Sequence, residues 1–245
     1  MRSFLAALQF LTVIPVPAQL EKGDAESSPF WFAQVGLVLG ASVALVDALL
    51  ARTCCSGLLR SILSIGVLAA LSGGLHLDGL ADTADGFLSA RPRERVLEIM
   101  RDSRIGTMGV LALVFVLAIK VAALAQINGP TRWKMLLFAP LSGRALQVIN
   151  MSLLPYARKQ TGGKAAVFIH RNLGRFSIWS GLWMLTANVT LFGLWRGAEY
   201  LAVIVIIATW LAVWSLRRIG GFTGDTLGAT SEIVEASILL FACTT

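Results

Sequence analysis

Three aspartates lie within eight consecutive positions of the otherwise apolar segment 73–87. They are Asp78, Asp82 and Asp85. The chain contains only 14 Asp and Glu residues among 245, so this concentration is unusual. Spacings of four and three residues put the three side chains on one face of a helix, where like charges repel one another. A divalent cation bound through carboxylate oxygens is the simplest way to neutralise such a face.

This segment can be interpreted in two ways. A solvated helix end would need no ligand for its charges. A metal site is favoured by the surrounding Leu, Ala and Gly residues, which limit solvation of the carboxylates. His76, two residues before Asp78, is either a hydrogen-bonding residue at the helix end or a proton-transferring group.

Two more segments carry residues suited to phosphate chemistry. Asp102 follows Arg101 and lies two residues before Arg104, so it either pairs with an arginine or shares a site with them. Gly221 and Gly224 belong to a glycine-rich turn, which is a weak phosphate-binding signal on its own.

A second acidic stripe follows that turn. Asp225 and Glu232 are seven residues apart and share one helical face, with Glu235 about one turn further. Asp225 alone would fit charge matching at a helix N-terminus, but the whole stripe exceeds that need. Arg144 lies inside an apolar segment, where a charge is costly and faces a carboxylate, a cavity or the membrane surface.

The composition of the chain indicates where these residues work. Hydrophobic residues make up 56% of the chain, charged residues 14%, and the mean hydropathy is +0.73. A soluble domain carries about 25% charged residues. We therefore predict an all-α, polytopic helical membrane protein with six to seven transmembrane helices, in which residues 1–245 form a single integral membrane domain in the lipid bilayer. The net charge of +7 fits basic loops at a membrane surface, and we exclude nucleic acid as a partner because no recognition module is visible.

Seven apolar segments can supply these helices. Whether the last one spans the membrane is open because its first half is polar. Whether residues 1–17 enter the membrane or lie at its surface is also open. The segments are 30–51, 57–77, 105–127, 133–155, 176–195, 198–215 and 225–243. Glycines inside them predict close helix packing in lipid. They are Gly36, Gly40, Gly66 and Gly143.

Basic residues orient the segments in the membrane. Of the 21 lysines and arginines, 14 fall on one side and five on the other. The richer side contains residues 1–29, 78–104, 156–175 and 216–224. Because Lys and Arg accumulate in cytoplasmic loops, we place these residues in the cytoplasm. Both acidic segments, the arginines and the basic loop 158–175 then meet at one membrane face, as a site for a di- or triphosphate with Mg²⁺ requires.

With these residues in view, nearly the whole chain resembles the cobalamin synthase family, whose members are adenosylcobinamide-GDP ribazoletransferases. The segments 73–87 and 102–106 carry the most specific part of the resemblance. It extends over residues 10–15, 35–40, 73–87, 101–109 and 220–235. The chain departs from the family at Val13, where an arginine often precedes the Ile-Pro pair, so a role for a basic group there is in doubt.

The resemblance implies a Mg²⁺-dependent, multi-pass enzyme of the cell inner membrane with its active site facing the cytoplasm. Such an enzyme joins adenosylcobinamide-GDP to α-ribazole or α-ribazole 5′-phosphate, releases GMP, and completes the nucleotide loop of adenosylcobalamin or its 5′-phosphate. The preferred acceptor stays open. So do a homo-oligomer and contacts with other cobalamin-assembly enzymes.

The residue pattern and the resemblance together predict the roles of individual side chains. The three aspartates of segment 73–87 hold Mg²⁺ against the pyrophosphate, with Asp225 or Glu232 completing the site. Arginines offset the charge on the leaving GMP. Either a carboxylate or His76 accepts the proton of the attacking ribose hydroxyl. The residues predicted to act in catalysis are His76, Asp82, Arg101, Asp102 and Arg104. Those predicted to bind the substrate are Arg144, Gly221 and Gly224.

Two other functions fit part of the pattern. Phospholipid synthases that use CDP-alcohols also have an Asp-rich, Mg²⁺-binding helix, but their pattern has Ala-Arg after Asp-Gly, whereas Ala81 is followed here by Asp82. A transporter for a cation or a corrinoid would place acids near the membrane midplane in two similar halves. The carboxylates here lie at one membrane edge, and no internal repeat is visible.

Overall fold

The structure is a computed structural model that describes residues 1–16, 20–53, 55–158 and 164–244. Within these ranges the chain forms helices and no strand, apart from an isolated bridge between Tyr156 and Phe222. The predicted all-α fold is therefore confirmed. In chain order the elements are α1 (Arg2–Leu11), α2 (Lys22–Glu26), η1 (Ser28–Trp31), α3 (Phe32–Leu50), α4 (Gly57–Leu71), α5 (Leu75–Phe87), α6 (Arg93–Ile99), α7 (Thr107–Gln126), α8 (Gly129–Leu153), η2 (Lys164–Phe168), α9 (Leu173–Ile219) and α10 (Gly224–Thr244).

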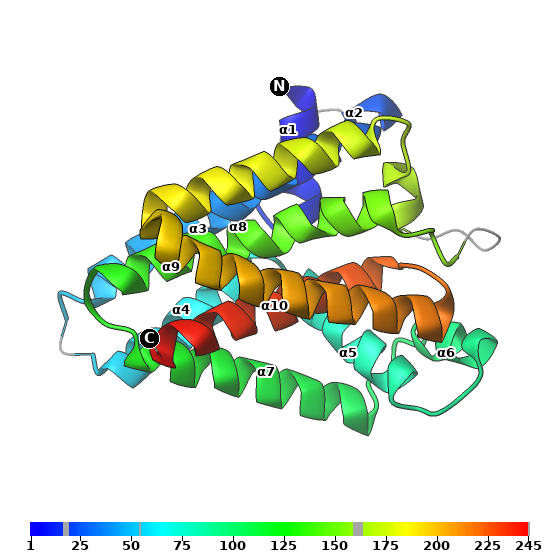
Figure 1. Ribbon diagram of the computed structural model, residues 1–245. Coiled ribbons are helices and arrows are strands. Elements are labelled where there is room, and N and C mark those ends of the chain that lie inside the picture. The colour runs from blue at the N-terminus through cyan, green and yellow to red at the C-terminus, as the bar shows by residue number, and fades with distance from the viewer. Residues whose placement is uncertain (17–19, 54, 159–163, 245) are drawn as a thin grey trace.

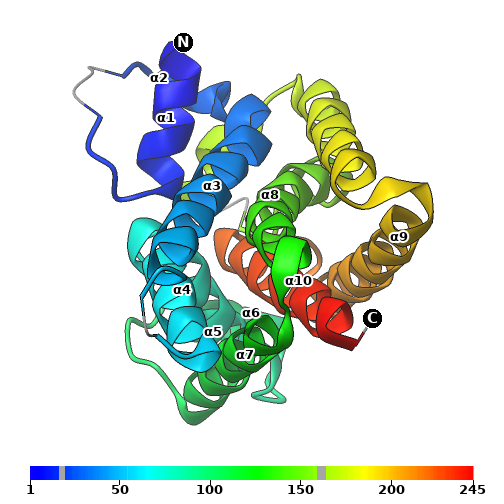
Figure 2. The ribbon, with the colours of Figure 1, turned by 90° about the vertical axis from the view of Figure 1, so that its left-hand side faces the viewer.

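Helices α8 and α10 form the middle of the bundle (Figure 2). α8 packs against α3, α9 and α10, and α10 also packs against α5 and α7. The apolar stretch of α10 is 72% buried inside the protein, whereas that of α7 is only 22% buried. α7 therefore turns most of its apolar surface outward, as a helix facing lipid does.

Helices α3 and α8 cross closely because two glycines of α3 face the α8 backbone. A Cβ atom at Gly36 would lie 2.6 Å from the Pro140 carbonyl oxygen, and one at Gly40 would lie 2.6 Å from that of Leu136. The prediction of close packing at these glycines is confirmed. It is wrong for Gly66, where an added Cβ would meet no described atom within 4 Å.

The predicted span 57–77 is not one straight helix. α4 ends at Leu71 and α5 begins at Leu75, with a bend of 90° between them. Gly73 and Gly74 make this turn with φ angles of 60° and 68°, a left-handed conformation that costs other residues roughly 1–2 kcal/mol. The aspartates on α5 therefore lie on a separate helix, turned at a right angle to α4.

Helix α9 is a hairpin with two arms rather than a straight rod of 47 residues. Gly193 interrupts it with φ 76° and ψ 177°, a conformation that is essentially restricted to glycine. The chain reverses there (Figure 1), and the Asn188 side-chain amide donates to the Gly197 carbonyl oxygen at 2.7 Å. The two predicted helices are present, but the predicted break at 196–197 is misplaced because only the glycine permits the reversal.

The predicted count of six to seven spans is not confirmed. Among the described residues, four helices are long and apolar enough to cross a membrane, or five if α4 and α5 together count as one bent span. α9 counts once in this number despite its two arms, and the 25-residue α8 is not included. α1, with ten residues, is too short to cross about 30 Å of hydrocarbon.

The charges inside the bundle are paired. Lys120 Nζ lies 2.5 Å from Glu232 Oε2 and 2.7 Å from Glu235 Oε2, and Arg144 pairs with Glu235. We call Lys120, Arg144, Glu232 and Glu235 the buried charge cluster, since each is at most 5% exposed. Two positive and two negative charges cancel, which makes the cluster compatible with an apolar interior.

The described residues of segments 78–104, 156–175 and 216–224 lie at one end of the bundle, and α2 lies toward the same end (Figure 1). α6 and the start of α10 lie at this end, whereas the α3–α4 and α7–α8 connections and the C-terminus lie at the opposite end. The connections rich in basic residues and those poor in them therefore lie at different ends of the bundle, as the count of basic residues predicts.

Reporter fusions test the predicted orientation. A reporter inserted between α6 and α7 should report the cytoplasm, and one inserted at 127–128 should report the opposite side, because a single helix, α7, separates the two sites. Alkaline phosphatase and green fluorescent protein activities at each position provide the measurement. Finding both positions on one side of the membrane would contradict a spanning α7.

Candidate active site

Helices α5 and α10 approach each other so closely that carboxylates from two distant segments meet. A Cβ atom at Gly79 would lie 2.7 Å from the Asp225 carbonyl oxygen, so only glycine fits between the helices. The carboxylate of Asp82 is consequently repelled by Asp225 and by Asp78. We call Asp78, Asp82 and Asp225 the acidic cluster. The predicted helix and the predicted meeting of two acidic segments are both present.

Asp85 has a different position from the acidic cluster. Its oxygens accept the backbone N–H groups of Gly106 at 2.7 Å and Gly109 at 2.8 Å. These donors lie at the start of α7, where helical N–H groups lack intrahelical partners. A Cβ at either glycine would lie 2.5 Å from the carboxylate, which explains both glycines. Asp85 thus caps α7, and this geometry lends no support to its predicted role as a metal ligand.

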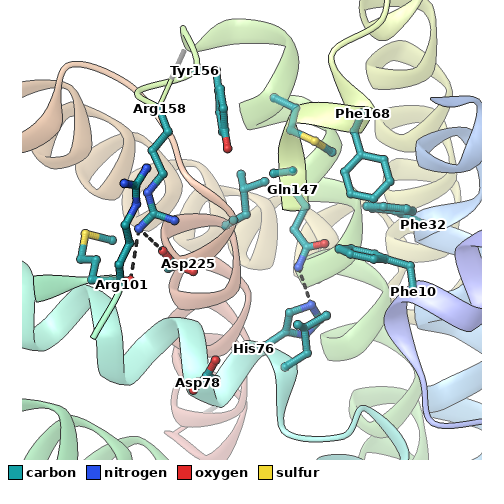
Figure 3. Close-up of a pocket in the computed structure, with 16 residues that line it drawn as sticks. Phe10, Phe32, His76, Asp78, Arg101, Gln147, Tyr156, Arg158, Phe168 and Asp225 are labelled. Atoms are coloured by element: carbon teal, nitrogen blue, oxygen red, sulfur yellow. Dashed lines mark hydrogen bonds and ion pairs between the residues drawn. The ribbon is translucent and has the colours of Figure 1, made fainter. Parts of the chain in front are cut away.

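A cavity of about 460 Å³ lies beside the acidic cluster, and we call it the large cavity. It is lined by residues from the N-terminal part of the chain, from α5 and α8, and from the start of α10. The lining residues are Phe10, Phe32, Leu75, His76, Asp78, Met100, Arg101, Gln147, Met151, Tyr156, Arg158, Ala165, Phe168, Gly224, Asp225 and Leu227. Figure 3 shows aromatic rings on one side, arginines and Asp225 on the other, and His76 with Gln147 between them.

The charged side of the large cavity combines cations with carboxylates. Arg158 Nη2 lies 2.9 Å from Asp225 Oδ2 and donates to the Met100 carbonyl oxygen at 3.1 Å. Arg101 lines the same side (Figure 3). Arginines beside carboxylates can bind phosphate oxygens while the carboxylates bind a cation. Arg158 was predicted only as part of the basic loop 158–175, of which residues 159–163 lie outside the described residues.

His76 lies at the base of the cavity in a defined hydrogen-bond pattern. The Gln147 amide nitrogen lies 2.7 Å from His76 Nε2 and donates to Ser231 Oγ at 2.8 Å. Ser231 Oγ itself donates to the Gly143 carbonyl oxygen at 3.0 Å, so it accepts from Gln147. With this amide orientation His76 Nε2 accepts a hydrogen bond from Gln147, and Nδ1 carries the ring N–H. His76 Nδ1 is buried and has no hydrogen-bond partner among the described residues, so His76 is an unpaired donor rather than a proton acceptor.

The other side of the large cavity is aromatic. The ring centroids of Phe10 and Phe168 lie 4.6 Å apart, those of Phe32 and Phe168 5.5 Å apart, and those of Phe10 and Phe32 6.0 Å apart. These three rings come from α3, η2 and the end of α1, so the wall is assembled from segments far apart in the sequence. Such a wall suits a flat heterocyclic ring, which stacks on aromatic side chains.

The glycine-rich turn before α10 joins two loops. The Phe222 N–H donates to the Pro155 carbonyl oxygen and the Ala157 N–H donates to the Phe222 carbonyl oxygen, both at 2.9 Å. A Cβ atom at Gly221 would overlap the Pro155 carbonyl oxygen. Gly221 therefore holds the loop of Arg158 in place and does not line the cavity, whereas Gly224 does, as its predicted binding role requires.

Asp102 and Arg104 form a local pair at the surface. Asp102 accepts from Arg104 Nε at 3.0 Å and from Nη2 at 2.7 Å. These hydrogen bonds lower the pKa of Asp102 to about 2, which makes it a poor proton acceptor near neutral pH. Neither residue lines the large cavity. The structure thus matches the alternative in which Asp102 pairs with an arginine, while Arg101 is the member of this segment that reaches the cavity.

Glu232 and Arg144 belong to the buried charge cluster and do not line the large cavity. Glu232 lies two turns, about 10 Å, along α10 from Asp225. Their predicted roles in metal and substrate binding therefore find no support in this geometry. Lys120 and Arg144 together explain the two glutamates of the second acidic stripe, because they neutralise Glu232 and Glu235 without a metal.

Several cavity residues were not predicted from the sequence. Among them, only Gln147 could have been suspected from the sequence, since an amide three residues after Arg144 is unusual in an apolar segment. Tyr156, Phe32 and Phe168 carried no such signal, because aromatic residues are common in membrane helices and loops.

A metal site formed by protein groups alone is absent from the described residues, where no three His, Cys, Asp or Glu side chains converge on one point. Mg²⁺ in phosphate-transferring sites is typically held by one or two carboxylates together with substrate phosphates. The acidic cluster offers such oxygens beside a cavity lined by arginines. Its carboxylates repel one another, and a bound cation would relieve this repulsion. The donor set therefore fits Mg²⁺ bound with a phosphorylated substrate.

The fold and the site together define a helical membrane protein with a cavity suited to phosphate-ester chemistry. Comparisons with known proteins are more specific. The family model for cobalamin-5-phosphate synthase matches residues 3–243. Proteins named adenosylcobinamide-GDP ribazoletransferase are 42% identical in Klebsiella pneumoniae strain 342, over 98% of both chains, and 39% identical in Citrobacter koseri, over 97% of both chains.

The chain therefore belongs to the cobalamin-5-phosphate synthase family, and it is a transferase. The resemblance stated from the sequence motifs is confirmed. No solved structure is significantly similar to this chain.

Proposed function

We propose that this chain joins adenosylcobinamide-GDP to α-ribazole, or to its 5′-phosphate, and releases GMP, with Mg²⁺ as the cofactor. The observation that carries the proposal is the large cavity, in which carboxylates and arginines face an aromatic wall. The names of the relatives favour this transferase activity over the transporter and the CDP-alcohol lipid synthase.

In the proposed reaction a ribose hydroxyl oxygen of the acceptor forms a bond to the cobinamide-side phosphorus. The bond between this phosphorus and the bridging oxygen breaks, and GMP leaves with that oxygen. Arg101 and Arg158 bind the phosphates and stabilise the charge that develops on the leaving group. Asp225 pairs with Arg158 and would also hold Mg²⁺, so Asp78 is the remaining cavity carboxylate and accepts the hydroxyl proton. His76 Nδ1 donates to an oxygen of the substrate.

Mg²⁺ would be held by Asp82 and Asp225 of the acidic cluster together with phosphate oxygens, and it would supply charge neutralisation at the pyrophosphate. Tyr156 and Arg158 come from one loop, which the Phe222 bridge fixes over the cavity. This loop and the aromatic wall exclude water from the reacting atoms, which favours transfer over hydrolysis. The proposed site lies at the cytoplasmic face of the inner membrane.

A direct assay tests the proposed function. Membranes containing the protein should form a cobalamin and GMP in equal amounts from adenosylcobinamide-GDP and α-ribazole, measured by chromatography. Membranes without the protein are the control. Failure of the purified, folded protein to form either product with α-ribazole or its 5′-phosphate would contradict the proposal.

Removal of Mg²⁺ should abolish this activity. Chelation with EDTA leaves the repulsion within the acidic cluster and the substrate charge uncompensated, so we expect at least about a hundredfold fall in GMP release. Adding Mg²⁺ in excess of the chelator should restore the rate. Unchanged turnover in EDTA would exclude Mg²⁺ as a required cofactor.

A further inference from the structure

A second cavity adjoins the large cavity. It lies between α6 and the loop 155–158, and its volume of about 540 Å³ somewhat exceeds the 460 Å³ of the large cavity, which has the longer lining. Arg101, Tyr156 and Arg158 line both cavities, so the two spaces meet at these side chains. Since the arginines are the phosphate-binding groups of the proposed reaction, the junction is where a pyrophosphate would lie.

The two cavities differ in chemistry. The large cavity ends in the rings of Phe10, Phe32 and Phe168. The second cavity has no such aromatic wall among the described residues that line it, and its α6 side carries two carboxylates. These are Glu94 and Glu98, four residues apart and therefore on one face of α6. The large cavity therefore suits an apolar ring, and the second cavity suits a ring that donates hydrogen bonds.

We propose that the two cavities are separate base-binding subsites: the aromatic wall of the large cavity binds the benzimidazole ring of α-ribazole, and the second cavity binds the guanine of the donor. This inference rests on the proposed function. It assigns the acceptor and the donor to opposite sides of Arg101 and Arg158.

The assignment follows from the hydrogen-bonding groups of the two bases. A ribosylated benzimidazole ring has no N–H donor and a single ring-nitrogen acceptor, so it loses little when it leaves water for an aromatic wall. Guanine presents two neighbouring donors, N1–H and the N2 amino group, which a carboxylate accepts side by side. Placing guanine against the phenylalanines would leave these donors unpaired, at a cost of about 1–3 kcal/mol each.

The assignment also places the reacting groups consistently. With its base against Phe168, the acceptor has its ribose beside His76 and Asp78, the groups proposed to donate to it and to take its proton. With guanine against α6, the GMP phosphate lies at Arg101 and Arg158, which stabilise it as it leaves.

Two substitutions separate the subsites. Phe168→Leu removes the stacking face but keeps an apolar side chain, and it should raise KM for α-ribazole about tenfold. Glu94→Gln removes the charged acceptor and should raise KM for adenosylcobinamide-GDP about tenfold. Each variant should leave the KM of the other substrate within about twofold. Phe192→Leu, at a ring that lines neither of the two cavities, is the matched control.

Binding of α-ribazole alone and of GDP alone to the purified protein, measured by calorimetry, gives a readout independent of turnover. Phe168→Leu should weaken only α-ribazole, and Glu94→Gln only GDP. The reverse pattern, or equal effects on both ligands in a protein whose melting temperature matches that of the control, would overturn the assignment. If the wild-type protein forms no cobalamin and no GMP, the proposed function itself fails, which is a different result.

Discussion

Replacing Asp82 by asparagine is expected to lower kcat for GMP release by at least about a hundredfold, because a carboxylate that binds Mg²⁺ cannot be replaced by a neutral amide. The same change should leave the thermal unfolding temperature unchanged or raise it. Asp82 is repelled by Asp225, Asp78 and Asp85 and attracted only by Arg158 among the charges that act on it most strongly. Removing its charge therefore relieves repulsion in the folded state. Loss of activity without loss of stability is the signature of a residue kept for function.

Asp24→Asn provides the matched control for this experiment. Asp24 is a carboxylate of the surface helix α2, where it accepts the Glu21 backbone N–H, and asparagine can make the same hydrogen bond. GMP release and the unfolding temperature should both stay near wild-type values. Near-normal turnover of Asp82→Asn would contradict the metal role. A fall of several degrees in its unfolding temperature would show that the acidic cluster stabilises the fold.

The opposite result is expected for Lys120→Met, which should destabilise the protein by about 3–5 kcal/mol, the usual effect of removing one partner of a buried ion pair. Lys120 is 1% exposed and contacts both Glu232 and Glu235. Its removal changes the buried charge cluster from neutral to one uncompensated negative charge. The free energy of unfolding, measured by denaturant titration in detergent, should fall accordingly.

A second substitution distinguishes charge balance from lost packing. Lys120→Met combined with Glu232→Gln makes the cluster neutral again and should recover a large part of the lost stability. The effects of substitutions on stability are not additive when the two residues are in contact. Lys22→Met removes a lysine whose side chain is 84% exposed and should change stability by less than about 1 kcal/mol. A double variant no more stable than Lys120→Met alone would show that packing, not charge, explains the loss.

Sequence patterns were sufficient for the features that depend on neighbouring residues. The helix that carries Asp78 and Asp82, and the glycines of α3, could be predicted because their spacing alone determines which face they share. The pairing of Lys120 with Glu232, 112 residues away, could not, and so an acidic stripe was interpreted as metal ligands. The aromatic wall was missed for the same reason, since Phe10 and Phe168 meet only through tertiary packing.

The reversal at Gly193 decides whether the proposed active site can form. The cavity needs Arg158, which precedes η2 and α9 in the chain, and Asp225, which follows α9, at one end of the bundle. An unbroken helix of 47 residues would hold these segments about 70 Å apart, more than twice the thickness of the hydrocarbon layer. Because Gly193 folds α9 back on itself, the chain between Arg158 and Asp225 runs along the bundle once in each direction and returns to the end at which it started. The two halves of the proposed catalytic centre therefore share one end of the bundle because of a glycine at the opposite end.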